Sequence, residues 1–213
     1  MQRTFMNSYT EIDTQALLNE HYEIIQDRWD QALTACQLDV VILHAGAARF
    51  YFEDDQGPRF QPNPHLLQWI PPEYSVANSC LLLSPGQKPC LLFYQPEDYW
   101  HATPAAPEHL STYLDIKVFP THGALKTYCA DHAKKCATDP KGIAFIGEVT
   151  DQTQLQSNWQ ANPPQLIHRA HFARAKKTEY ELAAMRNASQ MGALGHNAAA
   201  QCFTDGGCEF DVH

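Results

Sequence analysis

The sequence feature that most constrains the fold is a helix start signal late in the chain, at Thr178 and Glu181. A threonine followed three residues later by a glutamate forms a capping box, in which each side chain accepts a hydrogen bond from the other residue's backbone N–H. From Leu182 to Phe203, small or apolar residues recur three or four positions apart, and Gly206-Gly207 follows as a stop signal. The pattern predicts one helix of about seven turns.

This predicted helix needs a cover. Alanine and glycine dominate it between residues 183 and 200, so another element could pack close to its backbone. Cys208 to Asp211 resemble the opening of a further helix, yet the sequence ends at His213, and a helix of one turn does not sustain itself. We therefore expect the chain to be the front part of something longer, or to be covered by a partner.

Composition and charge exclude several classes of protein. The chain has 213 residues, of which 44% are hydrophobic and 18% charged, as in ordinary globular proteins. The net charge of -9 argues against binding to nucleic acid or to an anionic membrane surface. We find no apolar run of membrane-spanning length and no hydrophobic signal region. Seven cysteines without a C-x-x-C motif predict reduced thiols in a cytoplasmic protein.

Helix and strand patterns alternate along the first part of the chain. Together they predict an α/β domain with a mixed sheet. The prolines between residues 60 and 74 predict a loop, which the apolar residues among them favour as ordered. The predicted elements are a helix over 17–36, a buried strand over 38–44, a possible strand at Arg49–Phe52, a strand pair over 79–84 and 89–94, strands over 115–119 and 142–146, and a helix over 122–136.

Several motifs carry a resemblance to a known family. Arg174-x-x-Lys-Thr-x-x-Glu-Leu182, preceded by an α/β domain, resembles the creatinase/prolidase/aminopeptidase P family, whose catalytic half has the pita-bread fold. The match narrows to the bacterial Xaa-Pro dipeptidases (PepQ-type prolidases), a branch that also contains organophosphorus acid anhydrolases. The residues that narrow it are Asp54-Asp55, Asn63-Pro64, Trp69-Ile70-Pro71 and the segment from Phe93 to His101.

This resemblance implies a domain organisation and a cofactor. Residues 1–14 would be a flexible N-terminus, 15–173 a creatinase/prolidase-like N-terminal domain with a mixed sheet flanked by helices, and 174–213 the start of an incomplete pita-bread domain. Family members hydrolyse Xaa-Pro dipeptides with two divalent ions, usually Mn²⁺, held by two Asp, one His and two Glu. Those ligands lie downstream of the position that matches His213, so we expect this chain alone to bind no metal and to be inactive.

The resemblance also places two substrate-binding residues on this chain, and no catalytic ones. In this branch the N-terminal domain forms a homodimer and extends its loops over the partner's active site. Asp55 matches a carboxylate that can hold the α-ammonium of a dipeptide, and Trp100 matches an indole that can wall an apolar pocket. The alternatives are a solvated acidic turn for Asp55 and a buried or interface aromatic for Trp100.

Other chemistry has less support in the sequence. A metal site could be imagined from His168 with His171, or from His196 with Cys202, but no further ligands complete it. Cys129 and Cys136 are interpreted as core residues of a helix, and no G-x-S-x-G elbow occurs. Three hypotheses remain: the non-catalytic front of a metallodipeptidase, a standalone interaction domain that pairs with a separate catalytic half, and the front of an organophosphorus acid anhydrolase-like enzyme.

Overall fold

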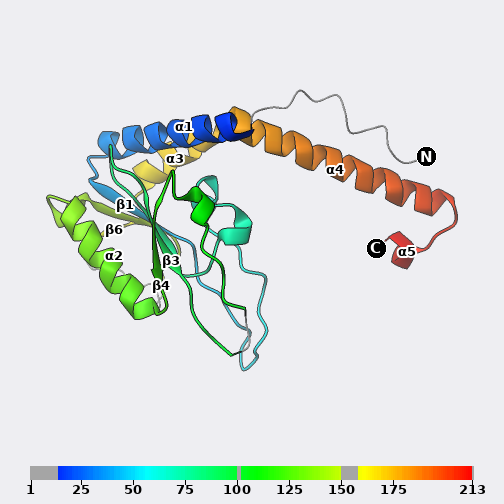
Figure 1. Ribbon diagram of the computed structural model, residues 1–213, viewed down its shortest axis with the longest axis horizontal. Coiled ribbons are helices and arrows are strands. Elements are labelled where there is room, and N and C mark those ends of the chain that lie inside the picture. The colour runs from blue at the N-terminus through cyan, green and yellow to red at the C-terminus, as the bar shows by residue number, and fades with distance from the viewer. Residues whose placement is uncertain (1–13, 100–101, 150–157, 213) are drawn as a thin grey trace. The chain divides into compact units, whose positions relative to one another are not determined.

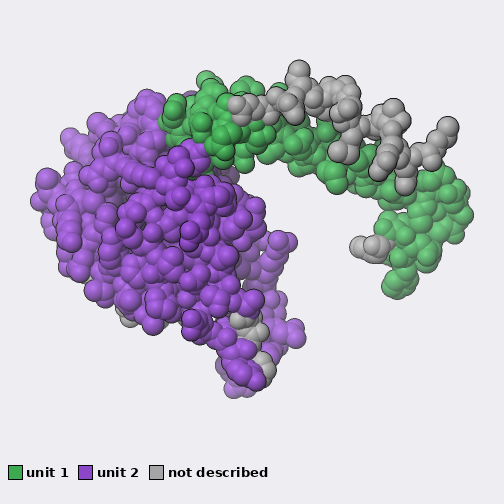
Figure 2. All heavy atoms as spheres, in the orientation of Figure 1, with its two compact units in different colours: residues 1–24, 176–213 green, residues 25–175 purple. Residues whose placement is uncertain are grey.

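The computed structural model describes residues 14–99, 102–149 and 158–212 and contains two compact units. The larger unit comprises residues 25–175, and the smaller comprises residues 1–24 and 176–213 (purple and green in Figure 2). Helix α1 (Thr14–Ala35) contributes residues to both. Among the described residues, no helix is long and apolar enough to cross a membrane.

The larger unit is built on a mixed sheet of six strands, which confirms the predicted α/β class. The order across the sheet is β4-β3-β2-β1-β5-β6. β2 pairs antiparallel with β1 and β3, whereas the remaining pairs are parallel. The strands are β1 (Val40–His44), β2 (Cys80–Leu83), β3 (Cys90–Tyr94), β4 (Asp115–Phe119), β5 (Ile143–Ile146) and the short β6 (Gln160–Ala161).

Helices cover both faces of this sheet. α2 (His122–Cys136) packs Leu125, Cys129 and Ala133 against one face in a core cluster that includes Val40 and Ile42 of β1. Val41 and Leu43 point to the other face, because successive side chains of a strand alternate, and they are fully buried as well. α3 (Pro164–Ala175) and the part of α1 that belongs to the larger unit, residues 25–35, lie on that second side (Figure 1). The position of Cys129 confirms its interpretation as a core residue.

The proline-rich segment between β1 and β2 is ordered, as predicted. Leu66, Trp69 and Ile70 are each at most 1% exposed, so they fix the segment to the core. Proline lacks a backbone N–H donor and therefore interrupts longer helices. Short 3-10 turns form in their place. In the larger unit these turns are η1 (Leu66–Gln68), η2 (Pro72–Tyr74), η3 (Glu108–Leu110) and η4 (Pro140–Gly142).

The smaller unit contains the predicted capping box. The Glu181 carboxylate accepts from the Thr178 N–H at 2.8 Å, and the Thr178 hydroxyl accepts from the Glu181 N–H at 3.2 Å. A ring nitrogen of buried His21 lies 2.9 Å from the same hydroxyl. The cap starts α4 (Glu179–Thr204), which α5 (Glu209–Val212) follows after Gly206 at φ +87°. The long helix is therefore confirmed at both ends.

Some parts of the secondary structure differ from the sequence prediction, among them Arg49–Phe52 and α3. Arg49–Phe52 is not a strand: no described strand pairs with it, and the Tyr51 N–H instead bonds the Gln56 carbonyl across a turn at 2.8 Å. The helix α3 was not predicted. Proline is well suited to the first helical position, where its missing N–H would have no partner in any case. Pro164 occupies that position here.

Candidate functional site

Two loops leave the same edge of the sheet and carry the predicted site residues. β1, β3, β4 and β5 run parallel to one another, so all of them end at one edge, here called the carboxyl edge. The first loop, residues 45–65, follows β1, and the second loop, residues 95–107, follows β3. Both project from the same end of the sheet (Figure 1). Ligands of open α/β sheets bind at such edges.

The first loop is anchored at its base by Asn63. The side-chain amide of Asn63 donates to the carbonyls of His44 and Ile146, at 3.1 Å in both cases, and so connects the loop to the ends of β1 and β5. The Asn63 backbone N–H also bonds the Ala45 carbonyl at 2.9 Å, which closes the loop on itself. An exposed ion pair of 2.8 Å between Arg49 and Glu148 links the loop to the segment after β5.

The two aspartates at the tip of the loop differ in their hydrogen bonding. Asp54 accepts a hydrogen bond from the Gln56 N–H at 3.0 Å, so its carboxylate forms part of the turn. A Cβ on Gly57 would lie 1.9 Å from the Arg49 carbonyl oxygen, and only glycine permits this approach. Asp55 is exposed, and within the described residues its carboxylate has no hydrogen-bond or ion-pair partner. Of the pair, Asp55 is the residue left available for a ligand.

The second loop is held at its start by Gln95. Its backbone N–H bonds the Phe119 carbonyl at 2.9 Å, and its side-chain amide donates to the Pro104 carbonyl at 2.8 Å, which joins the two ends of the loop. Trp100, the second predicted site residue, lies outside the described residues. The described ends of this loop leave the sheet at the same edge as the first loop.

Aromatic side chains are exposed on both loops. The exposed fractions are 69% for Phe50, 59% for Tyr51, 90% for Phe52 and 89% for Tyr99. Several large apolar side chains so close to one another in a loop are typical of a surface that contacts another molecule. A strand at Arg49–Phe52, as predicted, would bury alternate side chains, so this exposed cluster was not predicted.

A cavity of about 640 Å³ lies at the base of the first loop. It is lined by both ends of that loop, by residues 146–148 and by two residues of α3, Ile167 and His171. Asp55 does not line it. The Asp55 carboxylate is exposed and lies outside this cavity, so an enclosed site that includes Asp55 needs walls other than those of this cavity.

A buried histidine closes this cavity. His65 is 3% exposed and stacks on His171 with 5.0 Å between ring centroids. Its Nδ1 has no hydrogen-bond partner in the described part of the chain. Burial, with smaller contributions from His171 and Arg174, lowers the pKa of His65 to about 4, so the ring is neutral near pH 7. No sequence pattern pointed to this residue.

The histidines and cysteines considered for metal binding do not assemble into a site. His171 lies against His65, and His168 and His196 are exposed. Among the described residues, no three His, Cys, Asp or Glu side chains are grouped as a metal ion would require. The residues described here therefore do not fit the two-metal centre that the family resemblance implies.

Comparisons with known proteins agree on one family. A family model described as the N-terminal domain of Xaa-Pro dipeptidase matches residues 16–172. The chain is 34% identical over 197 residues to a Xaa-Pro dipeptidase of Pseudoalteromonas atlantica, and 36% identical over 199 residues to one of Erwinia tasmaniensis. Each alignment covers 92% of this chain and 43% of the relative, so the chain spans less than half the length of these proteins.

Solved structures are also similar to this chain. One of them is a putative aminopeptidase P from Bacillus anthracis, with a TM-score of 0.37 and 16% sequence identity. The alignment covers 68% of this chain and 34% of that one.

Proposed function

The chain belongs to the family of the Xaa-Pro dipeptidase N-terminal domain, and on this premise we propose that it is the N-terminal part of an enzyme that hydrolyses dipeptides with a C-terminal proline. Support comes from the family match over residues 16–172 and from relatives at 34% and 36% identity. The front of an organophosphorus acid anhydrolase-like enzyme is the alternative within the same branch, and comparing Xaa-Pro dipeptides with phosphotriesters as substrates separates the two.

In this proposal the chain supplies substrate contacts and another part of the protein supplies the chemistry. Two Mn²⁺ ions are the cofactor that the family resemblance implies, and the described residues do not group as their ligands. The relatives extend well beyond the aligned region, since only 43% of each is covered. We therefore expect hydrolysis only when a catalytic part accompanies this chain.

The observation that carries the proposal is the free carboxylate of Asp55. It stands at the exposed tip of a loop whose base is fixed by Asn63, so the carboxylate is positioned without being neutralised by a neighbour in the described chain. A carboxylate in this state suits the α-ammonium of a dipeptide, because a charge-assisted hydrogen bond is about twice as strong as a neutral one. Trp100, on the second loop, would wall the same site.

We propose that the active site reached by Asp55 belongs to a second copy of the chain. The tip carries exposed Phe50 and Phe52 beside Asp55, and these rings suit burial against another subunit. A homodimer that exchanges loops would supply the walls that Asp55 lacks within its own chain.

The experiment compares two matched substitutions in a full-length protein that joins this chain to the catalytic part of the Erwinia tasmaniensis relative. Asp55→Asn and Asp54→Asn remove the same charge, and asparagine at residue 54 keeps an oxygen that can accept from the Gln56 N–H. We expect Asp55→Asn to lower kcat/KM on Xaa-Pro dipeptides about ten- to a hundredfold and Asp54→Asn to leave it nearly unchanged. N-acetylation of the substrate should cost the wild type as much as the Asp55 substitution does.

Mixing subunits tests whether the carboxylate acts across a dimer. Asp55→Asn chains combined with chains that lack a metal ligand should recover activity, because the intact metal site then receives an intact Asp55 from its neighbour. Equal kinetics for the two asparagine variants, or no recovery on mixing, would reduce Asp54-Asp55 to a solvated turn.

A further inference from the structure

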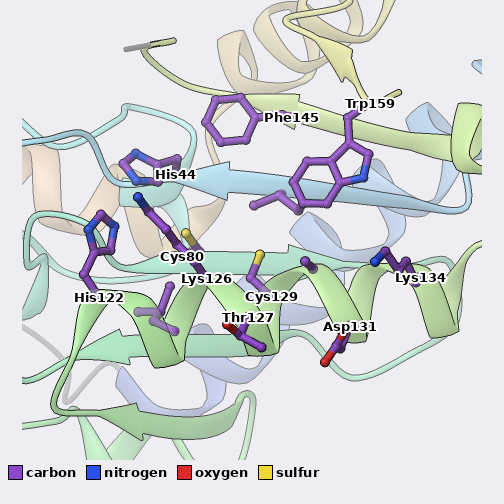
Figure 3. A pocket seen from close by; sticks show the side chains of 13 residues that line it. His44, Cys80, His122, Lys126, Thr127, Cys129, Asp131, Lys134, Phe145 and Trp159 are labelled. Atoms are coloured by element: carbon purple, nitrogen blue, oxygen red, sulfur yellow. The ribbon is translucent and has the colours of Figure 1, made fainter. Parts of the chain in front are cut away.

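A second cavity, of about 320 Å³, lies between α2 and the strands β1, β2 and β5 (Figure 3). It is distinct from the cavity at the base of the first loop, although His44 lines both. Its lining combines nitrogen-bearing side chains with aromatic and sulfur-bearing ones. The residues that matter for the argument are His44, His122, Lys126, Phe145, Cys80 and Trp159.

His44 presents a hydrogen-bond donor to this cavity. The ring is 4% exposed, and its Nδ1 accepts from the Gly46 N–H at 3.1 Å. A neutral ring with an accepting Nδ1 carries its proton on Nε2, and Nε2 has no hydrogen-bond partner in the described part of the chain. Burial lowers the pKa of His44 to about 4, with further lowering by His122 and Lys126 and an opposing effect of Glu148. The ring is thus a neutral donor near pH 7.

Two more donors converge on the same end of the cavity. In Figure 3 the ammonium end of Lys126 extends toward the rings of His44 and His122. Lys126 has no ion-pair partner among the residues that the structure describes. His122 is the first residue of α2, where the backbone N–H groups and the helix dipole add positive potential. Three nitrogen-bearing side chains therefore lie at this end of the cavity, with no carboxylate lining it.

No carboxylate lines this end of the cavity. Glu148 acts on His44 from outside the lining, and it is ion-paired with Arg49. Asp131 also lines the cavity, but it lies five residues beyond Lys126 along α2, a rise of about 7.5 Å. Figure 3 shows its carboxylate pointing away from His44 and His122. The cavity accordingly has one end that carries the Lys126 ammonium beside two histidines. Its other end has charges of both signs, from Asp131 and Lys134.

The wall facing α2 is apolar. Phe145 and Trp159 line it with their rings (Figure 3). The thiol of Cys80 remains protonated, because a hydrogen bond with Cys129 and burial raise its pKa well above the usual range. An apolar body can therefore rest in the cavity without leaving a buried charge unpaired.

We propose that this cavity binds a small organic carboxylate. The carboxylate accepts from His44 Nε2 and from the Lys126 ammonium, and it lies near His122 at the start of α2. The apolar body of the ligand packs against Phe145 and Trp159. This site is independent of dipeptide hydrolysis, since it shares no residue with the Asp55 tip.

Benzoate is the probe that tests this site, with benzamide as a neutral control of the same shape. Titration of the ¹⁵N-labelled full chain by NMR should move the Trp159 indole N–H signal with benzoate and leave it in place with benzamide. Lys126→Met should weaken the benzoate Kd about tenfold or more, and Lys126→Arg should restore most of the affinity. Lys135→Met removes the same charge from an exposed residue of α2 that does not line the cavity, and it should change nothing.

Several results would overturn the proposal. These are no saturable shift of Trp159 with benzoate, an equal shift with benzamide, or equal benzoate affinities for Lys126→Met and Lys135→Met. Inorganic phosphate provides the remaining comparison. If phosphate competes fully with benzoate at equal concentration, the site recognises anions in general, and the organic carboxylate is refuted as its ligand. Each variant's NMR spectrum reports in the same sample whether the chain is folded.

Discussion

Strand β1 and helix α4 differ in what stabilises them. All five residues of β1 are buried, and the strand has hydrogen-bonded neighbours on both sides, β2 and β5. α4 has 26 residues and none is buried. Met191, Leu194 and Phe203 are 69%, 65% and 77% exposed, and in the described chain a Cβ on Gly192 or Gly195 would meet no atom within 4 Å.

The contrast teaches that local signals define where a helix begins but not how stable it is. The capping box of Thr178 and Glu181 satisfies N–H groups of the first turn, which contributes on the order of 1 kcal/mol. Most of the stability of a helix in a protein comes from packing one of its faces. We infer that the small and apolar residues of α4 are suited to a cover outside this chain, as the proposed catalytic part would provide.

The largest expected effect separates a side chain of β1 from one of α4. Ile42→Ala removes a side chain that is 1% exposed and leaves a cavity in the core cluster, so it should lower the free energy of unfolding by about 2 to 5 kcal/mol. Leu194→Ala should change it by less than about 0.5 kcal/mol, because Leu194 is 65% exposed. Urea unfolding followed by circular dichroism measures both. A large loss for Leu194→Ala would mean that α4 is packed.

The pH dependence of unfolding tests the burial of the core around β1. The pKa of His44 in the folded chain is about 4, below the ordinary histidine value of 6.5, so between these pH values the ring binds a proton in the unfolded chain and not in the folded one. Stability is therefore full above pH 6.5 and falls as the pH drops toward 4, by about 1.4 kcal/mol per unit at most. His65 acts in the same direction. Urea unfolding at successive pH values measures the slope, which His44→Gln should reduce. A flat profile would contradict the burial of these rings.

A smaller effect is expected at the cap of α4. Thr178→Ala removes the hydroxyl that serves the Glu181 N–H and lies beside His21, so helix content at 222 nm should fall, with a cost of about 1 kcal/mol. Thr178→Ser retains the hydroxyl and should retain the helix. Thr204→Ala is the matched control at the other end, where the hydroxyl only donates to carbonyls of the preceding turn. Equal losses for the two alanine variants would mean that the capping box contributes nothing specific.

Much of the fold follows from short-range patterns. The helix predicted over 122–136 has those bounds in the structure, and the core strands have the predicted type, because periodicity and chain punctuation are local properties. The strand predicted at Arg49–Phe52 was wrong because a strand needs a neighbour, and no pattern within those residues reports one. α3 was missed because its two buried positions, Leu166 and Ala170, give too weak a periodic signal.

The site was predicted less completely than the fold. The resemblance identified the Asp54-Asp55 pair, but only the turn geometry distinguishes the aspartate that bonds the Gln56 N–H from the one that remains free. The cavity at His44 joins residues from β1, α2 and β5 that are far apart in the sequence, so no spacing rule could find it. Trp100 lies outside the described residues, and its role stays a prediction.

Hydrogen exchange of the full chain tests most directly whether α4 relies on a cover from outside. Amides of Val40 to Leu43 should exchange only through global unfolding, which for a domain of this kind corresponds to protection of about 1,000-fold or more. Amides from Leu182 to Phe203 should exchange far faster, through opening of a helix that has a cap but no buried face. Adding the catalytic part of the Erwinia tasmaniensis relative in the same chain should slow the exchange of α4 and leave that of β1 unchanged. Equal protection of β1 and α4 in this chain alone would contradict the account.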